Sequence, residues 1–86
     1  MLLGVLKKDD EPGQRVGIVT SRRIGSAVVR NRVRRRLREI IRAARPRMIS
    51  GLWLVVVAKP PAAKAQFSTL SDEWTQLARR GSILRE

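Results

Sequence analysis

Blocks of apolar and polar residues alternate along this 86-residue chain, and they predict where its strands lie. Residues 1–6 are apolar and predict a first strand, and the β-branched run at 15–20 predicts a second. The polar stretch between them ends in Pro12 and Gly13, a pair that is typical of a turn. We therefore expect the two strands to form a hairpin with a loop of moderate length.

The segment from Ala27 to Ala44 repeats its apolar residues with the period of an α-helix. Ser26 is a suitable N-cap for this helix, and Pro46 ends it. At about 100° per residue, one face is apolar and is expected to be buried: Val29, Val33, Leu37, Ile40, Ile41 and Ala44. The opposite face is polar and carries Asn31, Arg35, Arg38 and Arg42.

A third strand and a second helix are predicted in the last part of the chain. Residues 52–58 are continuously apolar, which is the pattern of a central strand covered on both faces. Ser68 is expected to cap the helix that follows, and Gly81 is expected to end it. The buried stripe of this helix is expected at Leu70, Trp74 and Leu77, with Phe67 as a further candidate.

The order of these elements, β-β-α-β-α, predicts one small two-layer α/β (α+β) domain over residues 1–86. The helix between the strands near Val16 and Val55 has a suitable length for a crossover that joins parallel strands.

Arginine dominates the charge of the chain. Nineteen Lys and Arg against seven Asp and Glu give a net charge of +12, and fifteen of the nineteen are Arg. Eleven of these lie between residues 21 and 47, where Glu39 is the only acid. Because like charges on successive helical turns repel each other, a helix that keeps them is expected to bind a polyanion. The alternative is a solvated basic surface, although ordinary surfaces mix both signs.

The missing residue types exclude several kinds of site. Without Cys or His the chain has no disulfide, no thiolate metal site and no histidine base. Its acids lie mainly in a turn (Asp9, Asp10, Glu11) and at one helix start (Asp72, Glu73), so neither a metal site nor a catalytic residue is expected. No apolar run is long enough to span a membrane, and we expect a cytoplasmic protein.

One long motif makes the basic segment specific. Residues 21–39 are Ser-Arg-Arg-Ile-Gly-Ser-Ala-Val-Val-Arg-Asn-Arg-Val-Arg-Arg-Arg-Leu-Arg-Glu. This run resembles the signature of the bacterial ribonuclease P protein, which has a basic pair, Gly, a polar residue, Ala-Val, Arg-Asn-Arg and further basic residues that end in Arg-Glu. The flanks at 16–20 and 54–60 are also similar, so the resemblance covers nearly the whole chain.

The resemblance implies a fold, and it implies separate roles for the protein and the RNA of the enzyme. In this family the helix belongs to a left-handed β-α-β crossover, which departs from the usual right-handed rule. The Arg-Asn-Arg helix and the loop before it bind the catalytic RNA, and a cleft between sheet and helix binds the single-stranded 5′ leader of precursor tRNA. The RNA, with Mg²⁺ that it mainly holds itself, cleaves the phosphodiester bond. The protein is thus implied to be an accessory subunit of an endoribonuclease, with ribonuclease P RNA and precursor tRNA as partners and with no membrane or obligatory protein partner.

The residues expected to contact RNA come from two sources, the positions that match the family motif and the basic face of the helix. They are Arg22, Arg23, Arg30, Asn31, Arg32, Arg34, Arg35, Arg38 and Arg42. Arginines fork onto phosphate oxygens, and Asn31 can donate and accept towards 2′-hydroxyls or base edges. The alternative for Asn31 is a local backbone cap. Trp53 and Trp74 are expected in the core, the alternative being a Trp that stacks on a base.

Two features of this sequence depart from the pattern of the ribonuclease P protein family. Family members begin with an N-terminal helix and a short strand, whereas this sequence begins within the first long strand. Gly4 stands where family members tend to place an aromatic residue.

Three other functions stay open. A generic, ribosomal-type RNA- or DNA-binding module would use the same basic helix. A protein-only nuclease would need a carboxylate cluster, and a membrane-surface protein would need the apolar helix face that the core requires.

Overall fold

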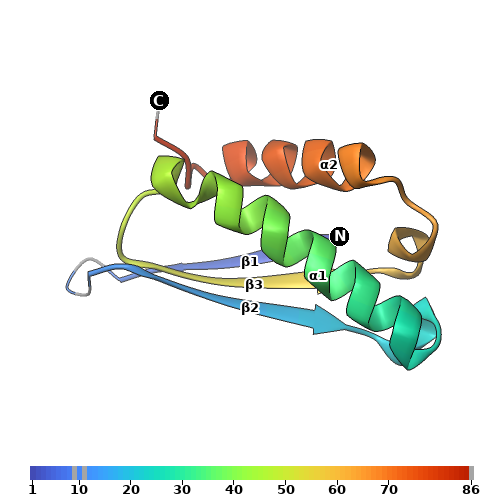
Figure 1. The fold of residues 1–86 in the computed structure, drawn as a ribbon. Coiled ribbons are helices and arrows are strands. Elements are labelled where there is room, and N and C mark those ends of the chain that lie inside the picture. Colours follow the sequence, from blue (N-terminus) through green and yellow to red (C-terminus); the bar gives the residue numbers. More distant parts are fainter. Residues whose placement is uncertain (9, 11, 86) are drawn as a thin grey trace.

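The computed structural model of the chain describes residues 1–8, 10 and 12–85. Within these residues, three strands and two α-helices form two layers: β1 (Leu2–Lys7), β2 (Gln14–Thr20), β3 (Leu52–Ala58), α1 (Ala27–Ala44) and α2 (Phe67–Arg80). Short 3-10 helices lie in the connections: η1 (Arg22–Ile24), η2 (Arg45–Arg47) and η3 (Pro60–Ala63). Figure 1 shows both α-helices on the same face of the sheet. The predicted order of elements and the bounds of the first helix are confirmed.

The sheet has the order β1-β3-β2, so the predicted hairpin between the first two strands is wrong. β3 lies in the middle, antiparallel to β1 and parallel to β2. All its residues are apolar, and such a strand is most stable where neighbours satisfy its backbone on both edges. The connection between β1 and β2 passes the start of β3. There the Lys8 N–H donates to the Gly51 carbonyl at 2.6 Å, and the Gly51 N–H donates to the Gly13 carbonyl at 2.7 Å.

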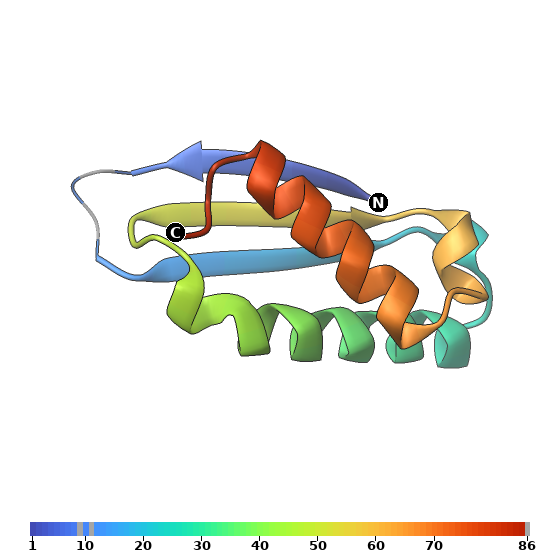
Figure 2. The same ribbon diagram turned by 90° about the horizontal axis from the view of Figure 1, so that it is seen from above.

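The connection β2–α1–β3 is a left-handed crossover. Val16 of β2 pairs with Leu54 of β3 in a parallel register. In Figure 2 the helices face the viewer, β2 and β3 both run to the right, and β3 lies above β2. The chain leaves β2, returns to the left through α1 in front of the sheet, and enters β3 from the left. The handedness expected from the family resemblance is confirmed, and the apolar periodicity contains no signal for it.

The core lies between the sheet and the two helices. The buried residues of the three central elements are Leu52, Leu54, Val56 and Ala58 of β3, Val33, Leu37, Ile40 and Ile41 of α1, and Leu70, Trp74 and Ala78 of α2. The predicted stripe of α1 is therefore confirmed, with Val29 and Ala44 half-buried at its ends. In α2, Ala78 is buried in place of the predicted Leu77, which is half-buried.

The other face of the sheet is open within the described residues, so the prediction that β3 is covered on both faces is wrong. Val55 is 46% exposed on this face, and Trp53, which was predicted in the core, is half-buried there. The centre of the Trp53 ring lies 4.9 Å from Lys8 Nζ and 5.2 Å from Arg15 Cζ. Successive side chains of a strand point to opposite faces, and both α-helices cover the face that carries Leu54.

α2 begins at Phe67, before the cap predicted at Ser68, and the side chain of Gln66 at its N-cap makes no capping hydrogen bond. Figure 2 shows the N-terminal end of α2 crossing over α1, beyond the edge of the sheet. Phe67 is 43% exposed at this end, so its candidate place in the buried stripe is wrong. At the other end, Gly81 is the C-cap as predicted.

Candidate nucleic-acid interface

α1 presents a row of polar side chains to solvent. Asn31, Arg35, Arg38 and Arg42 follow one another at spacings of three or four residues, and all four are exposed. They lie opposite the buried face of the helix, as the periodicity predicted. The row extends about 16 Å along the helix axis at 1.5 Å per residue. Because the buried face fixes the helix on the sheet, these four groups occupy defined positions on a rigid element.

Two further predicted residues, Arg22 and Arg23, lie in η1 just before α1 and are exposed. Gly25 makes the turn between the two helices at a φ of 148°, where L side chains are rare, and a Cβ there would lie 3.4 Å from the Val29 side chain. Ser26 caps α1 as predicted, its Oγ accepting from the Val29 N–H at 3.4 Å. The turn therefore places the basic pair at the N-terminal end of α1, where the helix dipole also favours an anion.

Arginines on one side of α1 hold the segment that leads into α2. Arg32 Nη2 donates to the Ala63 carbonyl at 3.2 Å. One turn further along, Arg36 Nη1 donates to the Ala65 carbonyl at 3.0 Å. Arg32, predicted to contact RNA, therefore has a structural contact as well, although its side chain remains exposed.

Arg30 and Arg34 are the least accessible of the predicted contact residues, since both are half-buried. Arg34 Nη2 donates to Thr20 Oγ1 at 2.7 Å, and Arg34 Nη1 donates to Asn31 Oδ1 at 3.3 Å. The Nε of Arg30 is buried and has no hydrogen-bond partner among the described residues. For the alternative of Asn31 as a local backbone cap, the described residues show no side-chain bond of Asn31 to the backbone, and its Oδ1 accepts from Arg34 instead.

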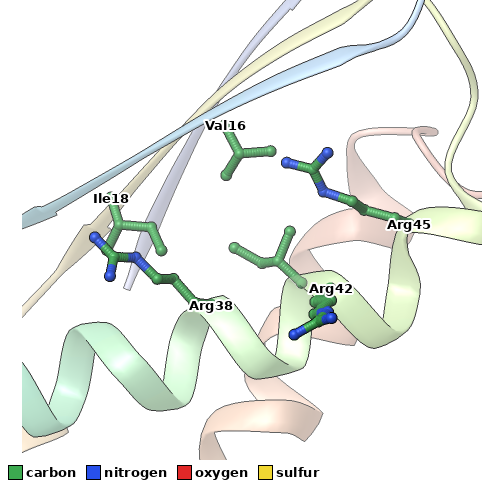
Figure 3. A pocket seen from close by; sticks show the side chains of 6 residues that line it. Val16, Ile18, Arg38, Arg42 and Arg45 are labelled. Carbon is green, nitrogen blue, oxygen red and sulfur yellow. The ribbon is translucent and has the colours of Figure 1, made fainter.

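A groove of about 450 Å³ runs between α1 and the edge strand β2. It is lined by Val16, Ile18, Arg38, Ile41, Arg42 and Arg45. Figure 3 shows Arg38 and Arg45 reaching from the helix towards β2 on two sides of this space. Arg45 lies outside the predicted set, although its spacing of three residues from Arg42 continues the basic row. The groove itself depends on the packing of β2 beside α1, which no local pattern in the sequence contains.

Polar contacts hold the two sides of the groove together at its ends. At one end, Gln14 Nε2 donates to the carbonyls of Arg45 at 3.3 Å and Met48 at 3.1 Å. At the other end, the Arg34 guanidinium bonds to Thr20. These contacts fix the arginines relative to the apolar floor.

The exposed row is electrostatically unpaired. Within residues 1–8, 10 and 12–85, the guanidinium groups of Arg35, Arg38 and Arg42 make no hydrogen bond or salt bridge. Closely spaced cations that form no salt bridge create a positive potential that attracts a polyanion.

Within the described residues, no group of three or more His, Cys, Asp or Glu side chains could hold a metal ion, and we assign these residues no metal-dependent step. None of the helices in this part of the chain has the length and apolar character needed to cross a bilayer.

Comparison with known proteins identifies the family of this fold and basic helix. A family model described as Ribonuclease P matches residues 1–81. The chain belongs to the ribonuclease P protein family. The Ribonuclease P protein component of Symbiobacterium thermophilum is 40% identical over 81 residues, which are 94% of this chain and 70% of the relative. That of Acidothermus cellulolyticus is 45% identical over 71 residues, which are 83% of this chain and 59% of the relative.

Solved structures of ribonuclease P proteins have the same fold. The RNase P protein of Staphylococcus aureus superposes with a TM-score of 0.85, and the match covers 96% of this chain and 75% of that one. Because the two sequences are only 19% identical, this superposition shows a shared fold and nothing more. The RNase P protein of Thermotoga maritima superposes with a TM-score of 0.79 at 27% identity, covering 91% of this chain and 74% of that one. The resemblance to the ribonuclease P protein that residues 21–39 carry is confirmed.

Proposed function

We infer that the chain acts as the protein component of ribonuclease P, a ribonucleoprotein that processes tRNA, and that it binds the RNA subunit through α1. The observation that carries this inference is the row of Arg35, Arg38 and Arg42, exposed and unpaired on a helix of a ribonuclease P protein fold. Guanidinium groups present paired donors that match phosphate oxygens, and their spacing of about one turn lets them contact successive phosphates.

The RNA contacts are divided between free and anchored side chains. Five arginines whose side chains make no hydrogen bond or salt bridge among the described residues would make the main phosphate contacts: Arg22, Arg23, Arg35, Arg38 and Arg42. Arg32 and Arg34 would add contacts through their remaining N–H groups, since a guanidinium has five donors. Arg30, with its buried Nε, would contribute mainly charge. Asn31 would contact a 2′-hydroxyl or a base edge from the middle of this surface.

For the single-stranded 5′ leader of precursor tRNA we propose the open face of the sheet, rather than the cleft between sheet and helix that the family resemblance implies. Lys8 and Arg15 lie over the Trp53 ring and offer phosphate contacts there, and the ring would stack on a base once one of these side chains moves aside. Gly4 adds no side chain to this face, so stacking depends on Trp53. The exposed apolar side chains of this face of the sheet are Leu2, Leu6, Val19 and Val55.

Phosphodiester cleavage is assigned to the RNA subunit and to Mg²⁺ that the RNA holds. This chain would position the RNA and the leader and would reduce repulsion between their phosphates. Its place of action would be the bacterial cytoplasm, and its role in the enzyme is that of an accessory subunit.

Selective RNA binding tests this proposal against a generic, ribosomal-type RNA-binding module. The dissociation constant for a bacterial ribonuclease P RNA is compared with that for a ribosomal RNA fragment of equal length, at several salt concentrations. We expect binding to ribonuclease P RNA that is tighter by at least about tenfold and stays tighter as salt rises. Equal constants with equal salt dependence would favour the generic module, because non-specific binding follows phosphate neutralisation alone.

A further inference from the structure

A second hollow lies beside α1, on the side opposite the groove with β2. It has a volume of about 310 Å³, and we call it the Phe67 pocket. The first residue of α2 stands on one side of it, and residues from three turns of α1 form the other. It is lined by Val28, Arg32, Arg35, Arg36, Glu39 and Phe67.

The Phe67 pocket combines exposed apolar side chains with cations. Phe67 is 43% exposed and Val28 is 76% exposed. The other large exposed hydrophobic residues in the described part of the chain lie on the strands, so these two form a separate apolar spot within the basic surface. An exposed aromatic ring among cations is the combination that proteins use to bind single-stranded nucleic acid.

The position of the ring is fixed by the arginines of the pocket itself. Arg32 and Arg36 bond to the carbonyls of Ala63 and Ala65, in the segment that leads directly into Phe67. The pocket is therefore built before any ligand binds, which reduces the entropy cost of binding.

We propose that the Phe67 pocket holds an unpaired base of the RNA subunit, stacked on the Phe67 ring, with the adjacent phosphate on Arg32 and Arg35. This rests on the proposed function, since α1 must first lie against that RNA. Bases splayed out of loops and bulges stack on aromatic rings, and every base has a face for this. Glu39 orients the nucleotide, because its carboxylate repels a phosphate and accepts a hydrogen bond from an N–H of the base edge.

An acidic peptide is the other polyanion that three arginines could attract. Its carboxylates would contact the guanidinium groups but would gain no stacking on the ring, and Glu39 would repel them. The aromatic ring and the acid together therefore favour a base over a peptide.

The test compares three substitutions of one residue. Binding of a bacterial ribonuclease P RNA is measured for the unchanged chain and for Phe67→Ala, Phe67→Leu and Phe67→Trp, with thermal melting of each protein. We expect Phe67→Ala and Phe67→Leu to weaken binding by about tenfold, within the range of one lost base stack, and Phe67→Trp to stay within about twofold. The salt dependence should not change, since no charge is removed. Val5→Ala, at a similarly exposed residue on β1 far from α1, should bind as the unchanged chain does.

Each other outcome overturns the proposal in a distinguishable way. If Phe67→Leu binds as well as Phe67→Trp, the ring acts by packing and holds no base. If the unchanged chain binds selectively and Phe67→Ala binds equally well, the pocket is empty in the complex while the proposed function stands. If Phe67→Ala binds this RNA as the unchanged chain does, and both bind an Asp/Glu octapeptide equally well, the occupant is a peptide held by the arginines. Failure of the unchanged chain to bind this RNA selectively would remove the proposed function and this proposal together.

Discussion

Replacing Arg35, Arg38 and Arg42 together by alanine is expected to weaken the binding of ribonuclease P RNA by about a hundredfold or more while the domain stays folded. Each side chain is exposed and makes no hydrogen bond or salt bridge within the described residues, so its loss removes contacts to phosphate and no polar contact within the protein. The affinity should also depend less steeply on salt. The magnitude of the slope of log affinity against log salt should decrease by roughly 2 to 3, because binding neutralises three fewer phosphates and releases correspondingly fewer counterions. The melting temperature should hold or rise slightly, since repulsion between successive turns is relieved.

A matched control separates the position of these charges from their number. Arg79, Arg80 and Arg85 are also exposed, and they lie at the end of α2 and just beyond it. Their triple replacement by alanine removes the same total charge. We expect a much smaller loss of affinity for this control. Equal losses for both triple variants would mean that RNA follows the net charge of the chain and that α1 has no special place in the complex.

Val33→Asp is expected to unfold the isolated domain. Val33 is 1% exposed and lies between α1 and the sheet, where a carboxylate would have no partner. An unpaired buried charge costs several kcal/mol, comparable with the whole stability of about 5 kcal/mol expected for so small a domain. Loss of the cooperative thermal transition, followed by circular dichroism, is the measurement.

Val28→Asp is the matched control on the same helix. Val28 is 76% exposed and lies in the first turn, where a negative charge interacts favourably with the helix dipole. The melting temperature of this variant should be close to that of the unchanged chain. A cooperative transition for Val33→Asp at the unchanged temperature would mean that the buried face of α1 is assigned incorrectly.

The parts of the fold that depend on local patterns were predictable. The period of the apolar residues sets the bounds and the buried face of α1, and Ser26 marks its start. The pairing of strands was not predictable in this way, because it depends on contacts between distant segments. Nothing in the turn at Pro12 and Gly13 shows that β3 inserts between β1 and β2. A continuous apolar strand likewise has the same pattern whether one face or both are covered.

In the candidate site, too, the features that follow from local patterns were predictable, and those that depend on contacts between distant segments were not. The exposed row on α1 follows from the helical period, and the motif at residues 21–39 gave the family. The sequence could not separate free arginines from anchored ones, because the acceptors for Arg32 and Arg36 are carbonyls about thirty residues away. The sequence also did not predict that Arg45 lines a groove or that Phe67 is exposed, for a related reason. Arg45 lines the groove because β2 packs beside α1, and Phe67 is exposed because α2 crosses over α1.

The most direct test of the central claim is cleavage of a precursor tRNA by a bacterial ribonuclease P RNA at low Mg²⁺, with and without this chain. We predict that the chain raises the rate by at least about tenfold, which corresponds to about 1.4 kcal/mol of additional transition-state stabilisation. The stimulation should increase with the length of the 5′ leader. An unchanged cleavage rate at protein concentrations that saturate the RNA would contradict the assignment of this chain as the working protein component of ribonuclease P.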